Sequence, residues 1–440
     1  MMDSFALGLA GLLALLALIA IRVPVAYTMV LVGIIGTMLQ TGPAIVLNQL
    51  KDLAYAQFSN YDLTVLPMFI LMGGLAARIG LSSDLFRGAN AWLGRFPGGV
   101  AMAAVAACAG FGALSGSSTA TASTMGQVAL PELRRYKFSP ALATGTVAAG
   151  GTLGILIPPS VVLIVYAIIV EANIVTMFAA ALLPGILAMV LFIATIAIYV
   201  WAIPGAGPTG HKVPRDELLQ ATLAIVPVIV IFGIVIGGIY AGIYNPTPAA
   251  AIGVFLVGVY GIVRGRLDWL GFRGALLETA RTSGMIFLIL LGAELLKIFM
   301  ARAGVPQAAA AALHDSALPA LAILVMIIVA FLILGCLMDS LSMVILAIPF
   351  FWPIVSGLEF GLGPQELKIW FGIIILVVVE LGLITPPVGL NVFIINSLSP
   401  DVPMRETFKG VMPFFASEIV RVTLLIAFPG ITLLLPRLLQ

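Results

Sequence analysis

Charged residues are scarce in this sequence. Asp, Glu, Lys and Arg make up 9% of its 440 residues, whereas a soluble domain carries about 25%. Hydrophobic residues account for 62%. A chain with so little charge cannot give a folded domain a water-compatible surface, and apolar segments in lipid fold as helices that satisfy their own backbone groups. The composition excludes a soluble domain and predicts an all-α polytopic membrane protein, surrounded by lipid and with no nucleic-acid partner.

Cysteine and histidine are nearly absent, with two residues of each. Cys108 and Cys336 lie in apolar surroundings, where we expect small buried side chains rather than a disulfide or a transition-metal site. His211 and His314 lie in predicted connections, where neither is placed to activate a serine as a general base. No phosphate-binding loop followed by Lys and Ser or Thr occurs in the sequence. We therefore expect neither an enzyme nor an ATPase, and no cofactor.

A cleavable signal peptide is also missing. The chain starts Met1-Met2-Asp3 without a basic segment, and Arg22 follows the first apolar run instead of preceding it. We therefore expect the first apolar run to remain as a membrane helix.

Ten apolar runs are long enough to cross a bilayer, which takes about 17 to 25 residues. The first half contains five of them, near 4–21, 23–40, 62–80, 140–171 and 176–201. The second half contains the other five, near 218–239, 246–263, 282–301, 368–398 and 405–428. Between the third and fourth crossing of each half lies an apolar stretch that small and polar residues interrupt, at 97–131 and 319–357. We expect each of these two stretches to form a re-entrant hairpin.

One unusual motif occurs twice. Leu153-Gly154-Ile-Leu-Ile-Pro158-Pro159 returns as Leu381-Gly382-Leu-Ile-Thr-Pro386-Pro387, each time inside a long apolar run. A Pro-Pro pair removes two backbone donors, so a helix cannot pass through it undisturbed. In a membrane such a break is tolerated only around a cavity, and paired breaks in two halves indicate the binding site of a secondary transporter. The sequence thus predicts two broken helices in a transporter.

The odd number of crossings per half places the second half upside down relative to the first. With the N-terminus outside, fifteen of the 21 Lys and Arg residues fall in predicted cytoplasmic loops, as the positive-inside rule favours. We therefore expect two inverted-topology repeats, 1–203 and 218–440, with both termini on the outer, periplasmic face. A cytoplasmic linker rich in Gly and Pro, 204–217, joins them. Segments 43–60 and 81–95 are too short or too polar to span and are expected as interfacial helices.

Small hydroxyl residues fill the tip of the first predicted hairpin. The tip reads Gly112-Ala-Leu-Ser115-Gly116-Ser117-Ser118-Thr119 between apolar arms. An unwound tip of this kind can present main-chain carbonyls and hydroxyls to a hard cation such as Na+. The second tip, Gly335-Cys-Leu-Met-Asp339-Ser340, aligns loosely with the first and adds one carboxylate. Close helix packing is the alternative explanation for these small residues.

Polar residues also flank the two predicted breaks at membrane depth. Thr152 and Ser160 flank the first break, and Thr385, Gly389 and Asn391 flank the second. The N-terminus of a half-helix favours an anion, whereas C-terminal carbonyls favour a cation. One site can therefore hold both kinds of ion.

Two acids stand alone within predicted membrane segments. Because an ionised carboxylate at membrane depth is costly, Asp339 and Glu380 are candidates for function. The alternative for Asp339 is capping of the returning hairpin arm, and the alternative for Glu380 is a structural hydrogen bond to a neighbouring helix.

Other charged residues within the spans are better explained by pairing. Glu294 with Lys297, and Glu418 with Arg421, have the spacing of intrahelical ion pairs. Arg302 stands at the predicted outer end of its span, where it can meet an anionic substrate, a partner protein or lipid headgroups.

Several of these motifs together resemble one known family. Gly112-Ala-Leu-Ser-Gly-Ser-Ser-Thr-Ala-Thr, Leu130-Pro-Glu-Leu133 and Gly151-Thr-Leu-Gly-Ile-Leu-Ile-Pro-Pro-Ser160 closely resemble the large membrane (M) subunit of tripartite ATP-independent periplasmic (TRAP) transporters. The second half agrees, with Asp339-Ser340, Thr385-Pro-Pro-Val-Gly389 and a Pro429-Gly-Ile ending. The resemblance covers essentially the whole chain.

This resemblance implies a sodium-coupled elevator transporter of the bacterial inner membrane. The hairpins and broken helices would form a transport domain that slides against a scaffold of the remaining helices, including those in 1–96 and 218–301. Three partners are implied: an organic acid anion as substrate, a periplasmic binding protein that delivers it, and a small four-helix membrane subunit on a separate chain.

The resemblance also implies site residues, with Na+ as the coupling ion and no other metal. One sodium site would comprise Ser115, Gly116, Ser117, Ser118, Thr119, Gly151, Thr152 and Pro158. The other would comprise Gly335, Asp339, Ser340, Thr385, Pro386 and Gly389. The substrate would meet Ser117, Ser118, Ser160, Asn391, Arg302 and Asp339.

Two other functions fit the same pattern. A lone cation-coupled carboxylate transporter of the wider elevator class shares hairpins and broken helices but needs no binding protein. Coupling to protons through Asp339 or Glu380 is the second alternative. A continuous channel would not need two inverted hairpins that meet two broken helices.

Overall fold

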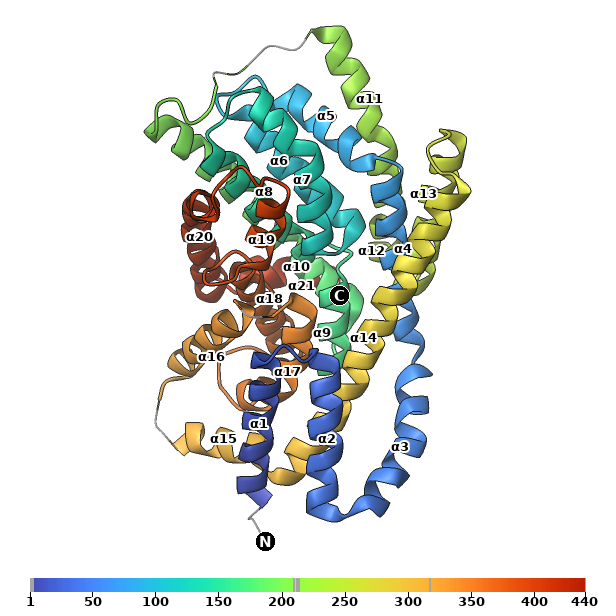
Figure 1. Ribbon diagram of the computed structural model, residues 1–440, viewed down its shortest axis with the longest axis vertical. Helices are drawn as coiled ribbons and strands as arrows, with labels where there is room; N and C mark the ends of the chain where they lie inside the picture. The colour runs from blue at the N-terminus through green and yellow to red at the C-terminus, as the bar shows by residue number, and fades with distance from the viewer. Residues whose placement is uncertain (1–3, 209, 211–213, 316–317, 337, 440) are drawn as a thin grey trace.

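The computed structural model describes residues 4–208, 210, 214–315, 318–336 and 338–439, and the regular elements of these residues are all helices (Figure 1). The first half contains α1 (Ser4–Ala20), α2 (Val25–Thr41), α3 (Pro43–Phe58), η1 (Tyr61–Thr64), α4 (Val65–Arg78), α5 (Leu81–Leu93), α6 (Gly99–Ser115), α7 (Ser118–Arg135), α8 (Pro140–Leu156), α9 (Val161–Val170) and α10 (Ile174–Ala202). The second half contains α11 (Arg215–Phe232), η2 (Gly233–Gly237), α12 (Gly238–Tyr240), α13 (Pro246–Val263), α14 (Trp269–Ala303), α15 (Val305–Asp315), α16 (Ala320–Gly335), α17 (Ser340–Val355), α18 (Pro364–Gly382), α19 (Leu390–Ser397), α20 (Met404–Ala427) and α21 (Gly430–Leu439). The predicted all-α class is confirmed.

Six helices in the described part of the chain are long and apolar enough to cross a membrane, and the bent pair α8–α9 adds a seventh. These seven correspond to seven of the ten predicted crossings. The other three are α1, α2 and the run 368–398. α1 and α2 have 17 residues each, so each is about 25 Å long at 1.5 Å per residue, somewhat short of a hydrocarbon core of about 30 Å. The run 368–398 is interrupted between α18 and α19.

Several helix boundaries differ from the prediction. α14 begins at Trp269 instead of near residue 282, because its first turns carry charged residues that mask a continuous helix in the hydropathy pattern. α15 and α21 were not predicted, since both are short and follow a predicted span closely. The expected interfacial segments 43–60 and 81–95 do form helices, α3 and α5.

The helices pack into two groups. One group, here called the frame, consists of α1–α5 and α11–α14, in which α14 lies along α2 and α4, and α13 lies along α4. The other, here called the hairpin group, consists of α6–α10 and α16–α21. Within it the hairpin α6–α7 packs on α8, and the hairpin α16–α17 packs on α18. In Figure 1 the long helix α14 and the helix α13 both lie against α4 along one side of the molecule.

The last long helix of each half, α10 or α20, packs with the broken helices. α20 contacts α8, α10, α18 and α19, and α10 contacts α8, α9 and α18. An added Cβ at Gly410 of α20 would lie 1.8 Å from the carbonyl oxygen of Ala141, and one at Gly145 of α8 would lie 2.3 Å from the carbonyl carbon of Gly410. The two backbones touch here, so α20 packs as part of the hairpin group.

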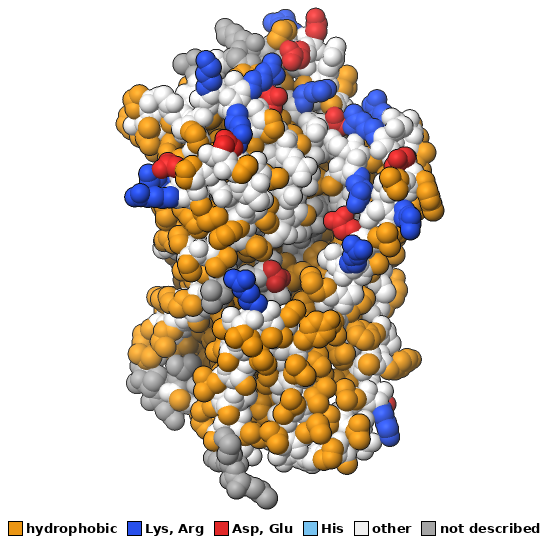
Figure 2. Space-filling view, viewed as in Figure 1, with side chains coloured by type: hydrophobic (Ala, Val, Ile, Leu, Met, Phe, Trp, Pro, Cys, Tyr) orange, Lys and Arg blue, Asp and Glu red, His pale blue; other side chains and the backbone are white. Residues whose placement is uncertain are grey.

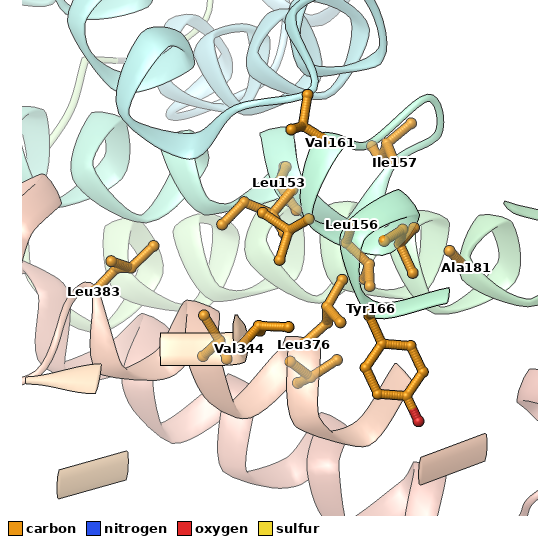
Figure 3. Close-up of a cluster of buried hydrophobic side chains, with 14 of the residues drawn as sticks. Leu153, Leu156, Ile157, Val161, Tyr166, Ala181, Val344, Leu376 and Leu383 are labelled. Carbon is orange, nitrogen blue, oxygen red and sulfur yellow. The ribbon is translucent and has the colours of Figure 1, made fainter. Parts of the chain in front are cut away.

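The core of the hairpin group lies beside the first break. Leu153 and Leu156 of α8 are fully buried and lie near Leu376 of α18 and Val344 of α17 (Figure 3). Tyr166 of α9 donates a hydrogen bond of 2.7 Å from its hydroxyl to the carbonyl of Lys368. Helix association in lipid depends on close packing and interhelical hydrogen bonds. This core therefore holds the two broken helices together across the two halves of the chain.

Charged side chains gather at one end of the molecule, the upper end in Figure 2, where α5 and the start of α11 lie (Figure 1). Three ion pairs join the two halves at this end: Arg78–Glu278 at 3.2 Å, Arg134–Asp401 at 2.7 Å and Arg266–Asp84 at 2.5 Å. The guanidinium of Arg134 donates to the carboxylate of Asp401 and holds its pKa below the ordinary range. The N-terminus lies at the opposite end (Figure 1). All six paired residues come from segments predicted to be cytoplasmic.

The contact between Gly145 and Gly410 predicts a stability effect. Gly410→Ala places a methyl group against backbone atoms that cannot rotate away, so α8 and α20 must separate. We expect a loss of about 3 kcal/mol in the free energy of unfolding, the upper range for overpacking, measured by unfolding in mixed detergent micelles. The control is Gly258→Ala, because an added Cβ at Gly258 meets no atom within 4 Å. Equal stability of the two variants would contradict this packing.

Candidate functional site

The first hairpin reverses direction in two residues. α6 ends at Ser115, Gly116 has φ +61°, and Ser117 caps α7 by accepting a hydrogen bond of 3.4 Å from the amide of Ala120. An added Cβ at Gly116 would lie 2.8 Å from the carbonyl oxygen of Pro159. Both the left-handed backbone and the close approach require glycine here.

Hydroxyl groups of this tip face one another. The Ser115 and Thr121 hydroxyls are 2.8 Å apart, and the Ser117 and Thr119 hydroxyls are 3.2 Å apart. The Ser115 hydroxyl also lies 3.4 Å from the carbonyl oxygen of Ser117. The tip therefore concentrates neutral oxygen atoms, which are ligands that a hard cation prefers. Thr121 was not among the predicted site residues, although it stands in the same hydroxyl-rich string.

The tip of the first hairpin sits directly on the first break. The amide of Val161 donates a hydrogen bond of 3.3 Å to the carbonyl of Gly116. An added Cβ at Gly112 would lie 2.6 Å from the Cα of Gly154, and one at Gly151 would lie 2.6 Å from the Cβ of Ala122. The structure thus brings the two segments of the first predicted sodium site together.

The first break lies between α8 and α9, which are bent by 43°. Ser160 is fully buried and caps α9 by accepting a hydrogen bond of 3.3 Å from the amide of Leu163. Pro158 is also buried, and the Thr152 hydroxyl donates a hydrogen bond of 2.7 Å to the carbonyl of Ala149. Ser160 and Thr152 thus already have structural partners within their own helices.

The second hairpin uses the same glycine contact as the first. An added Cβ at Gly382 would lie 2.7 Å from the Cα of Gly335, so α16 and α18 touch as α6 and α8 do. Asp339 caps α17 by accepting a hydrogen bond of 3.1 Å from the amide of Ser342. The capping alternative for Asp339 is therefore confirmed, and any further role of its carboxylate is in addition to this one.

The second predicted sodium site is less closely assembled. The Thr385 hydroxyl donates a hydrogen bond of 2.6 Å to the carbonyl of Leu381, Pro386 is exposed, and Gly389 has φ +62° at the start of α19. Within the described residues no hydrogen bond joins Asp339 or Ser340 to Thr385 or Gly389.

Asn391 connects the two halves of the chain. Its amide nitrogen donates a hydrogen bond of 2.7 Å to the Ser118 hydroxyl and lies 3.3 Å from the carbonyl oxygen of Ala148. Asn391 is fully buried, and its carbonyl oxygen has no partner in the described structure. Of the predicted substrate residues, the structure therefore brings Asn391 and Ser118 together at the tip of the first hairpin.

Arg302 is apart from this cluster. It lies exposed in the last turn of α14, in the frame, and no hydrogen bond or ion pair joins it to another described residue. α14 packs on α1, α2, α4 and α17. The structure therefore does not join Arg302 to Ser117, Ser118 or Asn391.

Glu380 has a partner that sequence reasoning did not find. Arg421 of α20 donates a hydrogen bond of 2.7 Å to Glu380, and it also pairs with Glu418 on its own helix. The structural alternative for Glu380 is thus confirmed, as are the two predicted intrahelical pairs, with Lys297 3.3 Å from Glu294. Arg421 and Glu380 are both charged residues within predicted spans. The one sequence signal that could have paired them is that a buried carboxylate in a membrane needs a cation nearby.

Comparison with known proteins shows which family has this arrangement of hairpins and broken helices. Residues 12–431 match the family described as the tripartite ATP-independent periplasmic transporter, DctM component. A C4-dicarboxylate TRAP transporter large permease protein of Pseudomonas aeruginosa is 33% identical over 378 residues, covering 86% of each chain. An isethionate TRAP transporter permease protein, DctMQ, of Oleidesulfovibrio alaskensis is 31% identical over 412 residues, covering 90% of this chain and 61% of that protein.

A solved structure agrees at the level of the fold. The YdaH transporter of Alcanivorax borkumensis superposes with a TM-score of 0.61 at 16% identity, covering 88% of this chain and 89% of that one. The likeness shows a shared helical architecture and no more. Together with the match over 12–431, the packed hairpins and broken helices establish that this chain belongs to the DctM family, the large membrane permeases of TRAP transporters.

Proposed function

We propose that this permease imports an organic acid anion, delivered by a periplasmic binding protein, in symport with Na+. The observation that carries the proposal is the first hairpin tip, where hydroxyls and carbonyls meet the first break. Two relatives are named for transport of C4-dicarboxylates and isethionate, both organic acid anions. Half-helix N-termini, such as those of α7 and α9 beside the tip, favour a negative charge.

Sodium coupling follows from the kind of ligands at the tip. Ser115, Ser117, Thr119 and Thr121 offer neutral oxygens at the hairpin tip, with the Ser115 and Thr121 hydroxyls 2.8 Å apart, and Gly116 brings the carbonyl of Pro159 close. A hard monovalent cation is bound well by several such oxygens without a carboxylate. The second sodium site, at Asp339 and the second break, would assemble around a carboxylate that already caps α17.

An elevator mechanism follows from the two packing groups. The glycine pairs 112/154 and 335/382 occupy corresponding positions in the two repeated motifs, which supports two inverted repeats. The returning arm of each hairpin packs on the second half of the other broken helix, α7 on α19 and α17 on α9. The hairpin group would therefore move as one body. An added Cβ at Gly73 of α4 would lie 2.7 Å from the Cα of Ser115, so the backbone of the frame lies against the tip at the boundary that the hairpin group would cross.

The positions of charge and the likeness to DctMQ suggest how the complex is built. The basic loops at one end support a cytoplasmic face there, with both termini periplasmic and the protein in the bacterial inner membrane. This chain spans 61% of the DctMQ permease, and we propose a small membrane subunit of four helices as a partner. It would pack on the frame, whose outer helices expose Leu223, Phe255 and Trp269.

Sodium should stabilise the purified permease. Sites at the hairpin tips exist only in the folded state, so a bound cation adds stability in proportion to its occupancy, about 2.7 kcal/mol at one hundred times its dissociation constant. Melting in detergent should occur at a higher temperature in NaCl than in KCl of equal ionic strength. Identical melting temperatures in the two salts would argue strongly against the sodium sites.

Loss of an oxygen ligand from either hairpin tip should weaken sodium-dependent uptake. The assay is uptake of a C4-dicarboxylate or isethionate into proteoliposomes that contain this permease and its small subunit, with the binding protein outside. Ser117→Ala and Asp339→Asn should each raise the Na+ concentration for half-maximal uptake about tenfold or more, the equivalent of 1.4 kcal/mol per ligand.

The matched control is Ser123→Ala on the same helix α7, which should leave uptake and its Na+ dependence unchanged. A purely structural role would lower the amount of folded permease without changing its Na+ dependence. Full uptake by both tip variants would refute the assignment of the tips. Uptake without the binding protein would instead support a lone carboxylate transporter.

A further inference from the structure

The cluster of Glu380, Glu418 and Arg421 is the most deeply buried group of charges in the described structure. All three side chains are at most 1% exposed. A single guanidinium nitrogen, Nη2 of Arg421, donates to one oxygen of each carboxylate, at 2.7 Å for Glu380. The proposed sodium sites and the proposed substrate site use none of these residues.

Several polar atoms of this cluster have no hydrogen-bond partner. The second oxygen of Glu380, the second oxygen of Glu418, and Nε and Nη1 of Arg421 are buried without a hydrogen-bond partner. Buried polar atoms in proteins nearly always have a partner, so unpaired ones indicate a bound water, ion or proton. Two ionised carboxylates and one guanidinium also leave a net charge of −1, which is costly in a low-dielectric interior.

The cluster lies between the two broken helices. Glu380 is in the last turn of α18, just before the second break, and α18 packs on α8, which ends just before the first break. Arg421 and Glu418 come from α20, whose backbone touches that of α8 at Gly145 and Gly410. The cluster thus joins α18 to α20 beside α8, and α18 and α8 are the helices that end at the two breaks.

Other titratable groups around the cluster have partners elsewhere or carry no charge. On the helices packed against α18 and α20, Tyr166 bonds to the carbonyl of Lys368, Asp339 caps α17, Arg437 pairs with Glu366, and Lys409 pairs with Glu406. Cys336, which follows α16, is a buried thiol. Within the described residues the cluster thus has no other charged partner to offset its net charge.

We infer that this cluster is a proton-binding site, in which the two carboxylates share one bound proton. One Glu oxygen takes a proton from water and becomes an O–H group, and no other bond forms or breaks. The net charge then falls to zero, and the new O–H can donate to one of the unpaired oxygens. Na+ is a poorer fit, because it prefers several oxygens, whereas the free atoms here include two cationic N–H groups. The site stands on this geometry and does not depend on the proposed sodium coupling.

Infrared spectroscopy of the purified, full-length permease at pH 7 tests the inference. A shared proton gives a carboxylic-acid C=O band with the intensity of one group, separate from the carboxylate bands. Glu380→Gln and Glu418→Gln should each abolish it, because the remaining Glu then forms a one-to-one ion pair with Arg421 and ionises. The control Glu294→Gln, in the exposed pair with Lys297, should keep the band.

A second measurement covers the case in which a Gln variant does not fold. Wild-type permease labelled with carboxyl-13C glutamate should shift the acid band, and permease labelled with carboxyl-13C aspartate should not. Exchanging NaCl for KCl should leave the band in place, which separates this proposal from the sodium sites. The absence of an acid band that shifts with labelled glutamate, or its survival in both folded Gln variants, would overturn the inference in favour of a fully ionised, hydrated cluster.

Discussion

Contact between glycine backbones is the constraint on which the hairpin group depends. Gly112 contacts Gly154 and so lets the first hairpin pack directly on its broken helix. Gly335 contacts Gly382 and does the same for the second hairpin. A side chain at any of these positions would lift a tip away from its break. Since tips and breaks supply the oxygens of the proposed sodium sites, the distance between two backbones decides whether such a site exists. The contact between Gly145 and Gly410 brings the backbone of α20 equally close to that of α8.

Polar contacts then fix the two halves to each other within this group. Asn391 of α19 reaches Ser118 of the first hairpin, and Arg421 of α20 reaches Glu380 of α18. In a membrane such bonds hold helices in register, because no hydrophobic force favours one helix pairing over lipid. The frame meets the group where α4 and α5 pack on α6, and at Gly73, whose backbone lies against that of Ser115.

Sequence reasoning found the parts that local chemistry determines. Pro158-Pro159 and Pro386-Pro387 interrupt helices wherever they occur, and a hydroxyl-rich string cannot continue an apolar arm, so both breaks and both tips were predictable. Contacts made only in the tertiary structure were not. The partner of Glu380 lies 41 residues away in the chain. The approach of Gly73 to Ser115 has no sequence signal, and hydropathy does not encode the packing of α20 on α8. For Arg302, its place at the end of a predicted span left an anionic substrate, a partner protein and lipid headgroups as alternatives, and only the family resemblance favoured the substrate.

Spin-label distances test most directly whether the hairpin group moves as one body against the frame. Labels at Gln127 of α7 and Ser397 of α19 report within the group, and labels at Tyr55 of α3 and Ser397 report between frame and group; all three positions are exposed. Adding Na+ and then the substrate-loaded binding protein should change the distance distribution between Tyr55 and Ser397 and leave that between Gln127 and Ser397 unchanged. An unchanged frame-to-group distance, or an equal change within the group, would contradict a rigid moving unit.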